Sequence, residues 1–130
     1  MPTLDAEQSR TMAKSYSDLA TALADYRFSH WNELTREQRA EIESREWTLR
    51  SYSSNMAAHA ITLTVSDSAE AVAGITRATK ELTAAARRVA AARSALAIAT
   101  AAVTLGGAIA SGHVLAIGEA VNKALSVAEG

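Results

Sequence analysis

The chain contains no cysteine, one proline and six glycines in 130 residues. Without cysteine it can form no disulfide bond and has no thiolate for catalysis or metal binding. The proline is Pro2, and Gly74 is the only glycine before residue 106, so helix-breaking and turn-forming residues are almost missing from the first hundred positions. The sequence therefore predicts long helices and no β-sheet.

Aromatic residues make up only 5% of the chain, so alanine, leucine, isoleucine and valine must fill the core. Thirteen basic and fourteen acidic side chains leave a net charge of −1. Such a chain has no overall positive field to attract a phosphate backbone, and we expect no nucleic-acid partner. Its length is that of one domain, so we expect residues 1–130 to form a single helical domain.

Two capping patterns organise the first half of the sequence. Asp5 with Gln8 begins a helix that we expect to run to about residue 29, and Thr35 with Gln38 begins a second helix that we expect to continue to about residue 65. Residues 30–34 form the break between them. Along the first helix, side chains suited to packing lengthwise on another helix alternate at spacings of four and three. They are Met12, Tyr16, Leu19, Leu23, Tyr26 and His30.

The second half is rich in alanine, which occupies eleven of the nineteen positions 84–102. Asp67 with Glu70 is a third capping pattern, and we expect a helix from there to about residue 105 that ends at Gly106 and Gly107. A fourth helix would follow from about residue 108 to 127. The predicted fold class is all-α, an antiparallel bundle of about four long helices with a C-terminal apolar helical hairpin. Close helix packing is expected at Ala86, Val89, Ala90 and Leu96.

The stretch Ser94–Gly118 has no charged residue, and two interpretations of it remain open. It is either the buried end of a helical hairpin or a segment that enters lipid. Neither half of it, before or after the glycine pair, is long enough to span a bilayer alone. In the lipid interpretation, the apolar side chains that face acyl chains are Ile98, Val103, Leu105, Ile109, Leu115 and Ile117. The arginines that contact anionic headgroups are Arg87, Arg88 and Arg93.

Residues suited to catalysis or metal binding are sparse. His30 and Glu33 have the reverse order of the Glu-x-x-His pairs in di-iron bundles, and no second pair exists. His59 and His113 lack a partner acid nearby, and the chain has no phosphate-binding glycine loop, nucleophile elbow or dinucleotide fingerprint. We therefore expect no enzyme activity, cofactor, metal or small-molecule substrate. Trp31 and Trp47 are expected to pack against a neighbouring helix, with the anchoring of a partner as the alternative.

The sequence around Trp31 resembles the small secreted helical-hairpin proteins that carry a Trp-x-Gly turn between two helices. In this chain Glu33 occupies the position of the glycine, so no functional residue is carried over. The apolar segment is also similar in outline to that of bacterial helical toxins, which hide an apolar hairpin until they meet a membrane. No residue-level motif accompanies that similarity.

These observations predict a non-enzymatic helical-bundle protein that acts through helix–helix association, as a homo-oligomer or with a helical protein partner. The alternative is a membrane-active protein whose residues 94–118 enter lipid. Asp5 and Glu7 interrupt the N-terminal region, which has no apolar segment, so we expect no cleavable signal peptide. A cytoplasmic location is favoured, with membrane association and signal-independent export left open.

Overall fold

The computed structural model describes residues 6–58 and 68–129. Within these residues 93% are helical and no β-strand is present, which confirms the all-α prediction. The helices are α1 (Ala6–Ser29), the short 3₁₀ helix η1 (Trp31–Glu33), α2 (Arg36–Ala58), α3 (Ser68–Arg88), α4 (Ala92–Ser111) and α5 (Val114–Glu129). The described part therefore has five α-helices where the sequence analysis expected about four.

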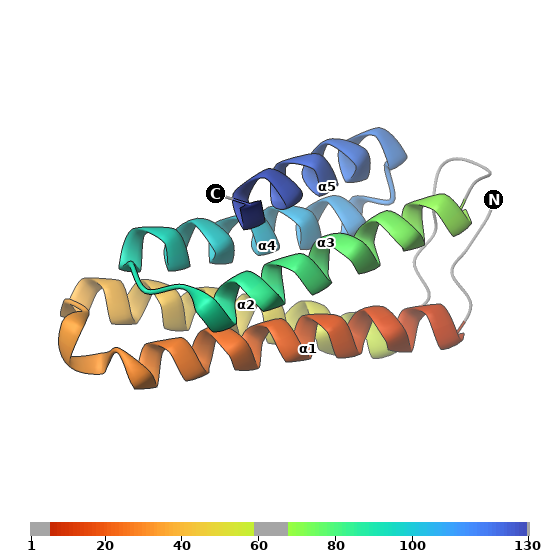
Figure 1. The fold of residues 1–130 in the computed structure, drawn as a ribbon. Helices are drawn as coiled ribbons and strands as arrows, with labels where there is room; N and C mark the ends of the chain where they lie inside the picture. The colour runs from red at the N-terminus through yellow and green to blue at the C-terminus, as the bar shows by residue number, and fades with distance from the viewer. Residues whose placement is uncertain (1–5, 59–67, 130) are drawn as a thin grey trace.

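The helices pack against one another as a bundle (Figure 1). α1 lies along both α2 and α3, α4 contacts α2, and α5 covers α3 and α4. The α1–α2 and α3–α4 connections lie at the same end of the molecule (Figure 1). The core contains the predicted stripe of α1 and many alanines of α3, α4 and α5. The buried residues of that stripe are Met12, Tyr16, Leu19, Leu23 and Tyr26.

The predicted capping box at the start of α2 is present. The backbone N–H of Thr35 donates to Gln38 Oε1 at 2.9 Å, and the backbone N–H of Gln38 donates to Thr35 Oγ1 at 3.1 Å. These two bonds satisfy backbone donors that a helix start leaves free. The predicted continuation of α2 towards residue 65, His59, and the capping residues Asp5 and Asp67 lie outside the described residues.

The single long third helix predicted for residues 67–105 is wrong, because α3 ends at Arg88 and α4 begins at Ala92. Ala91 between them is extended, with φ −86° and ψ 135°. The hydroxyl of Tyr26 donates to the Ala90 carbonyl at 3.1 Å and ties this break to the end of α1. Helix propensity favours a continuous alanine helix by only tenths of a kcal/mol per residue. Turning back buries one side of α4, and this larger gain decides the fold.

The pair Gly106–Gly107 lies inside α4 and does not end a helix, which corrects a second prediction. α4 ends instead at Gly112, whose φ of 73° is left-handed and whose N–H donates to the Ile109 carbonyl at 3.0 Å. A glycine tolerates this conformation without the steric cost of a Cβ atom. The C-terminal hairpin therefore joins α4 to α5 at Gly112–His113.

Gly106 has a packing role, because the ring of Tyr52 from α2 lies against it. The Tyr52 ring meets the ring of Tyr16 edge to face, with centroids 6.2 Å apart. The Tyr16 hydroxyl donates to the Ala102 carbonyl at 3.2 Å, and burial raises the pKa of Tyr16. Two tyrosines thus connect α1 and α2 to the same segment of α4.

We predict that Gly106→Ala destabilises the protein by about 1 to 3 kcal/mol, because the new Cβ would collide with the Tyr52 ring. Gly107→Ala is the matched control, since its Cβ would lie 3.6 Å from the Tyr52 hydroxyl and alanine favours the helix by up to about 1 kcal/mol. Urea unfolding followed by circular dichroism measures both effects. Equal stability of the two variants would contradict the packing role of Gly106.

Candidate functional site

Most apolar side chains of the uncharged stretch are internal. Ile98, Leu105 and Ile109 of α4 and Ile117 of α5 are buried together in the core, and Val103 is half-buried. Leu115 is different, because 85% of it is exposed at the start of α5. In the described residues α4 is the only helix long and apolar enough to cross a membrane, with a mean hydropathy of 1.6, and 44% of that apolar window is buried. A core helix of a soluble bundle passes the same test of length and composition.

The three arginines predicted to contact headgroups lie around the α3–α4 break, and their contacts differ. Arg88 donates from Nη2 to the Ala128 carbonyl at 2.8 Å and so holds the last turn of α5. Arg87, Arg88 and Arg93 are nevertheless all exposed. The three arginines are therefore three exposed cations, one of which is tied to α5.

The residues predicted for close helix packing do not form a single exposed surface. Ala86 is buried inside the bundle, Val89 and Leu96 are half-buried against the core, and Ala90 is exposed in the break. The alanine-rich face thus serves mainly for contacts within the chain, where small side chains let neighbouring helices approach closely.

The two histidines within the described residues, His30 and His113, lie next to helix ends. His30 stacks on Tyr26 with ring centroids 4.3 Å apart, and its Nε2 lies 3.9 Å from a carboxylate oxygen of Glu33. His113 is exposed between α4 and α5. Over residues 6–58 and 68–129, no group of three His, Asp or Glu side chains is placed to hold a metal ion.

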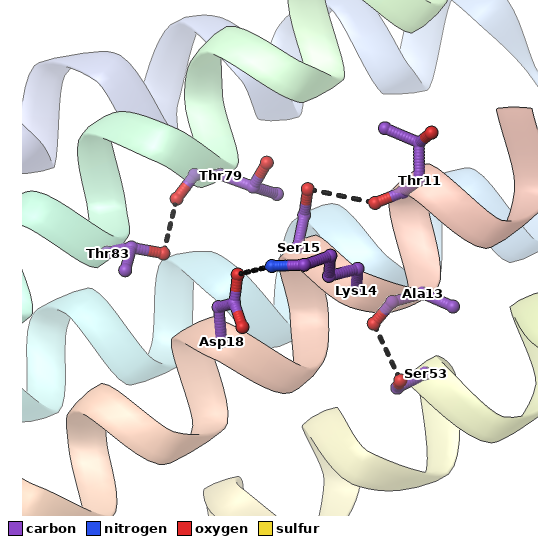
Figure 2. A network of polar contacts seen from close by, with 8 residues as sticks. All are labelled: Thr11, Ala13, Lys14, Ser15, Asp18, Ser53, Thr79 and Thr83. Carbon is purple, nitrogen blue, oxygen red and sulfur yellow. Dashed lines mark hydrogen bonds and ion pairs between the residues drawn. The ribbon is translucent and has the colours of Figure 1, made fainter.

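Three of the hydroxyl groups that line a hollow between α1 and α3, those of Ser15, Thr79 and Thr83, donate to carbonyls of their own helices, and Figure 2 shows two of these bonds. Ser15 donates to the Thr11 carbonyl at 3.1 Å, and Thr83 donates to the Thr79 carbonyl at 2.8 Å. Thr79 itself donates to the Ile75 carbonyl at 3.0 Å. Hydroxyls that bond to their own helix do not converge on a ligand, so this hollow offers weak recognition.

Both tryptophans were expected to pack against a neighbouring helix, and Trp31 does contact Phe28 of α1 and Arg39 of α2, but both side chains are exposed. Trp47 is 65% exposed, Trp31 is 43% exposed, and the neighbouring Phe28 is 64% exposed. These three are half of the six aromatic residues in the chain, and all lie on the α1–α2 hairpin. Phe28, Trp31 and Trp47 are called the aromatic surface below.

Two of these rings are ordered by stacking. The rings of Phe28 and Trp31 are nearly parallel, with an angle of 8° and centroids 6.1 Å apart. The guanidinium carbon of Arg27 lies 4.5 Å from the Phe28 centroid, and that of Arg39 lies 4.6 Å from the Trp31 centroid. Arg39 also donates to the Trp31 carbonyl at 2.7 Å. The rings are therefore held in position while one face remains open to solvent.

A buried ion pair beneath this surface joins α1 to α2. Arg27 donates from Nε to Glu46 at 2.7 Å and from Nη2 to the other Glu46 oxygen at 3.1 Å. Its Nη1 also lies 3.3 Å from the partly exposed Glu43. The hydrogen bond to Glu46 raises the pKa of Arg27. The sequence analysis missed this pair, because Arg27 and Glu46 are 19 residues apart and no local spacing connects them.

Helical spacing explains why Trp47 faces outward. Ile42, Leu49 and Met56 are the buried heptad positions of α2. Trp47 is two residues before Leu49, and at 100° per residue this places it on roughly the opposite side of the helix. It shares a shallow open hollow with Ala40, Glu43, Ser44, Thr48 and Ser51, all from α2. The heptad spacing of Ile42, Leu49 and Met56 was therefore enough to predict the outward position of Trp47 from the sequence.

Comparison of the chain with protein-family models, curated proteins and solved structures finds no match. The candidate site therefore consists of the features that the chain itself displays. The strongest of these is the aromatic surface.

We predict that Arg27→Met destabilises the fold by about 3 to 5 kcal/mol, because it leaves the buried Glu46 carboxylate without its partner. Adding Glu46→Leu to that variant should recover most of the loss. Lys14→Met is the matched control, since the Lys14–Asp18 pair is exposed (Figure 2) and worth less than about 1 kcal/mol. Thermal and urea unfolding test these values, and a loss no larger than that of the control would refute the structural role of the pair.

Proposed function

We propose that this protein is a non-enzymatic antiparallel helical bundle, folded as one domain, that acts through association with another helical protein surface. The observation that carries the proposal is the exposure of Trp47 with Phe28 and Trp31 on the α1–α2 hairpin. The proposed contact lies on α2 and the adjacent turn. It replaces the contact expected at Ala86, Val89, Ala90 and Leu96, whose side chains serve mainly internal packing.

The energetics of interfaces support a binding role for these rings. Tryptophan, tyrosine and arginine are the residues that most often dominate binding energy, because a large rigid ring loses little entropy when it is covered. All three rings are large and exposed, so each offers apolar area that a partner can cover.

The ion pair below the rings supports the proposal further. Arg27 and Glu46 fix the end of α1 against α2, and Arg39 fixes Trp31 through two backbone carbonyls, those of Trp31 and Leu34. Preordered side chains lose less freedom when a partner binds. The turn is therefore suited to present its rings in one arrangement.

Site-specific photocrosslinking in cells that contain the protein tests this proposal. A benzophenone amino acid placed at Trp47 should form covalent protein adducts. The same probe at Leu115 is the control, because Leu115 is also exposed but lies on α5. Adduct masses are measured by mass spectrometry. Equal adduct yields at the two positions, or no protein adduct at position 47, would reject the aromatic surface as the site of association.

A second candidate function is conditional membrane insertion of residues 94–118. The length and hydropathy of α4, together with the exposure of Leu115, favour it. In this candidate the bundle opens, so that Ile98, Val103, Leu105, Ile109 and Ile117 leave the core for acyl chains, and Arg87, Arg88 and Arg93 meet headgroups. The burial of four of these apolar residues makes opening costly. We therefore rank it second.

Lysine substitutions and liposome flotation distinguish the two candidates. We expect Ile109→Lys to cost several kcal/mol of folding free energy, because a fully buried position would receive an unpaired ammonium group, and Leu115→Lys to fold normally. The wild type should stay in the soluble fraction when mixed with anionic liposomes. Flotation of the wild type, lost on neutralising the exposed Arg87 and Arg93, would favour the membrane candidate instead.

A further inference from the structure

We infer that the aromatic surface binds a second copy of this chain, with the two α2 helices antiparallel and in contact around Trp47. This inference rests on the proposed function and names its partner. It draws on the distribution of side-chain size and charge along the outward face of α2.

The sizes of the side chains on the outward face of α2 favour close contact with a second helix. Trp47 lies at the centre of the solvent side of α2, and small side chains surround it along the same face. Ala40 is two turns before it, Ser51 is one turn after it, and Ser44 is one turn before it, all partly or fully exposed. A second helix can approach closely over these small residues, with the indole of Trp47 at the centre of the contact and the longer side chains of Glu43 and Arg50 along one edge. A face of this kind is complementary to itself, as a two-fold interface requires.

Charge gives the direction of the second helix. Glu43 and Arg50 are seven residues apart and so lie along the same edge of the outward face. In an antiparallel pair, residues on equivalent edges meet, so Glu43 of one copy lies beside Arg50 of the other, and the two-fold symmetry repeats this pair. In a parallel two-fold pair the edge that carries Glu43 and Arg50 would instead face the opposite edge of the other helix, so this ion pair would not form. Among the described residues Arg50 forms no ion pair within its own chain.

The register follows from this charge pairing. The axis that relates Glu43 to Arg50 passes between residues 46 and 47, so the two Trp47 rings lie next to each other at the centre. Phe28 lies on the edge of Glu43, because the guanidinium of Arg27 contacts both the Phe28 ring and the Glu43 carboxylate. It would therefore extend the contact towards the second half of the other α2. Aromatic rings at the centre with ion pairs at the edge match the usual arrangement of an interface.

Sedimentation equilibrium of the purified full chain tests self-association. We expect a mass twice that of the 13.7 kDa chain at tens of micromolar concentration. Trp47→Ser should raise the dissociation constant at least about tenfold, as is typical of a central interface residue. Leu115→Ser, which removes an exposed apolar group on α5, should leave it unchanged. Circular dichroism shows whether each variant is folded.

Disulfide trapping tests the direction, since the natural chain has no cysteine. A mixture of Glu43→Cys and Arg50→Cys chains should form a disulfide-linked heterodimer on mild oxidation, while neither variant alone should form a linked dimer. In the antiparallel register, position 43 of one copy lies beside position 50 of the other. The two copies of position 43 are then about 10 Å apart along the helix axis, which is too far for a disulfide bond. A linked dimer from Glu43→Cys alone would therefore overturn the antiparallel arrangement.

The outcomes also separate this inference from the proposed function. A wild type that stays monomeric at several hundred micromolar overturns self-association. If the photoprobe at Trp47 then still links to a different protein, the proposed function stands and only the identity of the partner is wrong. A monomer without any protein adduct at position 47 rejects both.

Discussion

The contact of Tyr16 and Tyr52 with α4 fixes how the two halves of this chain meet. The Tyr16 hydroxyl bonds to the Ala102 carbonyl, and the Tyr52 ring occupies the space that a side chain at position 106 would fill. In a core built largely of alanine, few side chains are long enough to reach across from one helix pair to another. These two rings do so, and the remaining helices pack at the spacing that they set.

The α1–α2 hairpin carries the proposed binding surface because its interior is completed without the tryptophans. Apolar heptad positions fill the space between the helices, and the Arg27–Glu46 pair fills the end. Removing both charges from water is unfavourable, and the bidentate geometry offsets that cost. Aromatic residues that the interior has no room for are left on the outside, where a partner can cover them.

Patterns among residues close together in the sequence predicted much of the fold. They did not predict the features that depend on contacts between distant residues. The Thr35–Gln38 capping box and the three-four spacing of α1 depend on neighbouring residues, and both predictions were confirmed. The break at Val89–Ala91 depends on contacts with α1 and α5 that no local pattern records. Gly106 was taken for a helix end because glycine has two uses, a left-handed turn and close packing, which only the tertiary structure distinguishes. For the candidate site, the outward position of Trp47 could be read from the heptad, whereas the Arg27–Glu46 pair joins residues far apart in sequence.

The bend between α3 and α4 lies in a segment whose local preference is helical, so it persists only through the tertiary contacts around it. If those contacts were released, residues 68–111 would straighten into one rod of roughly 65 Å. The rod would carry α5 away from the helices that it covers in the bundle. The alanine-rich connection is therefore a position where local helix preference and tertiary packing oppose each other, and the packing holds the bend.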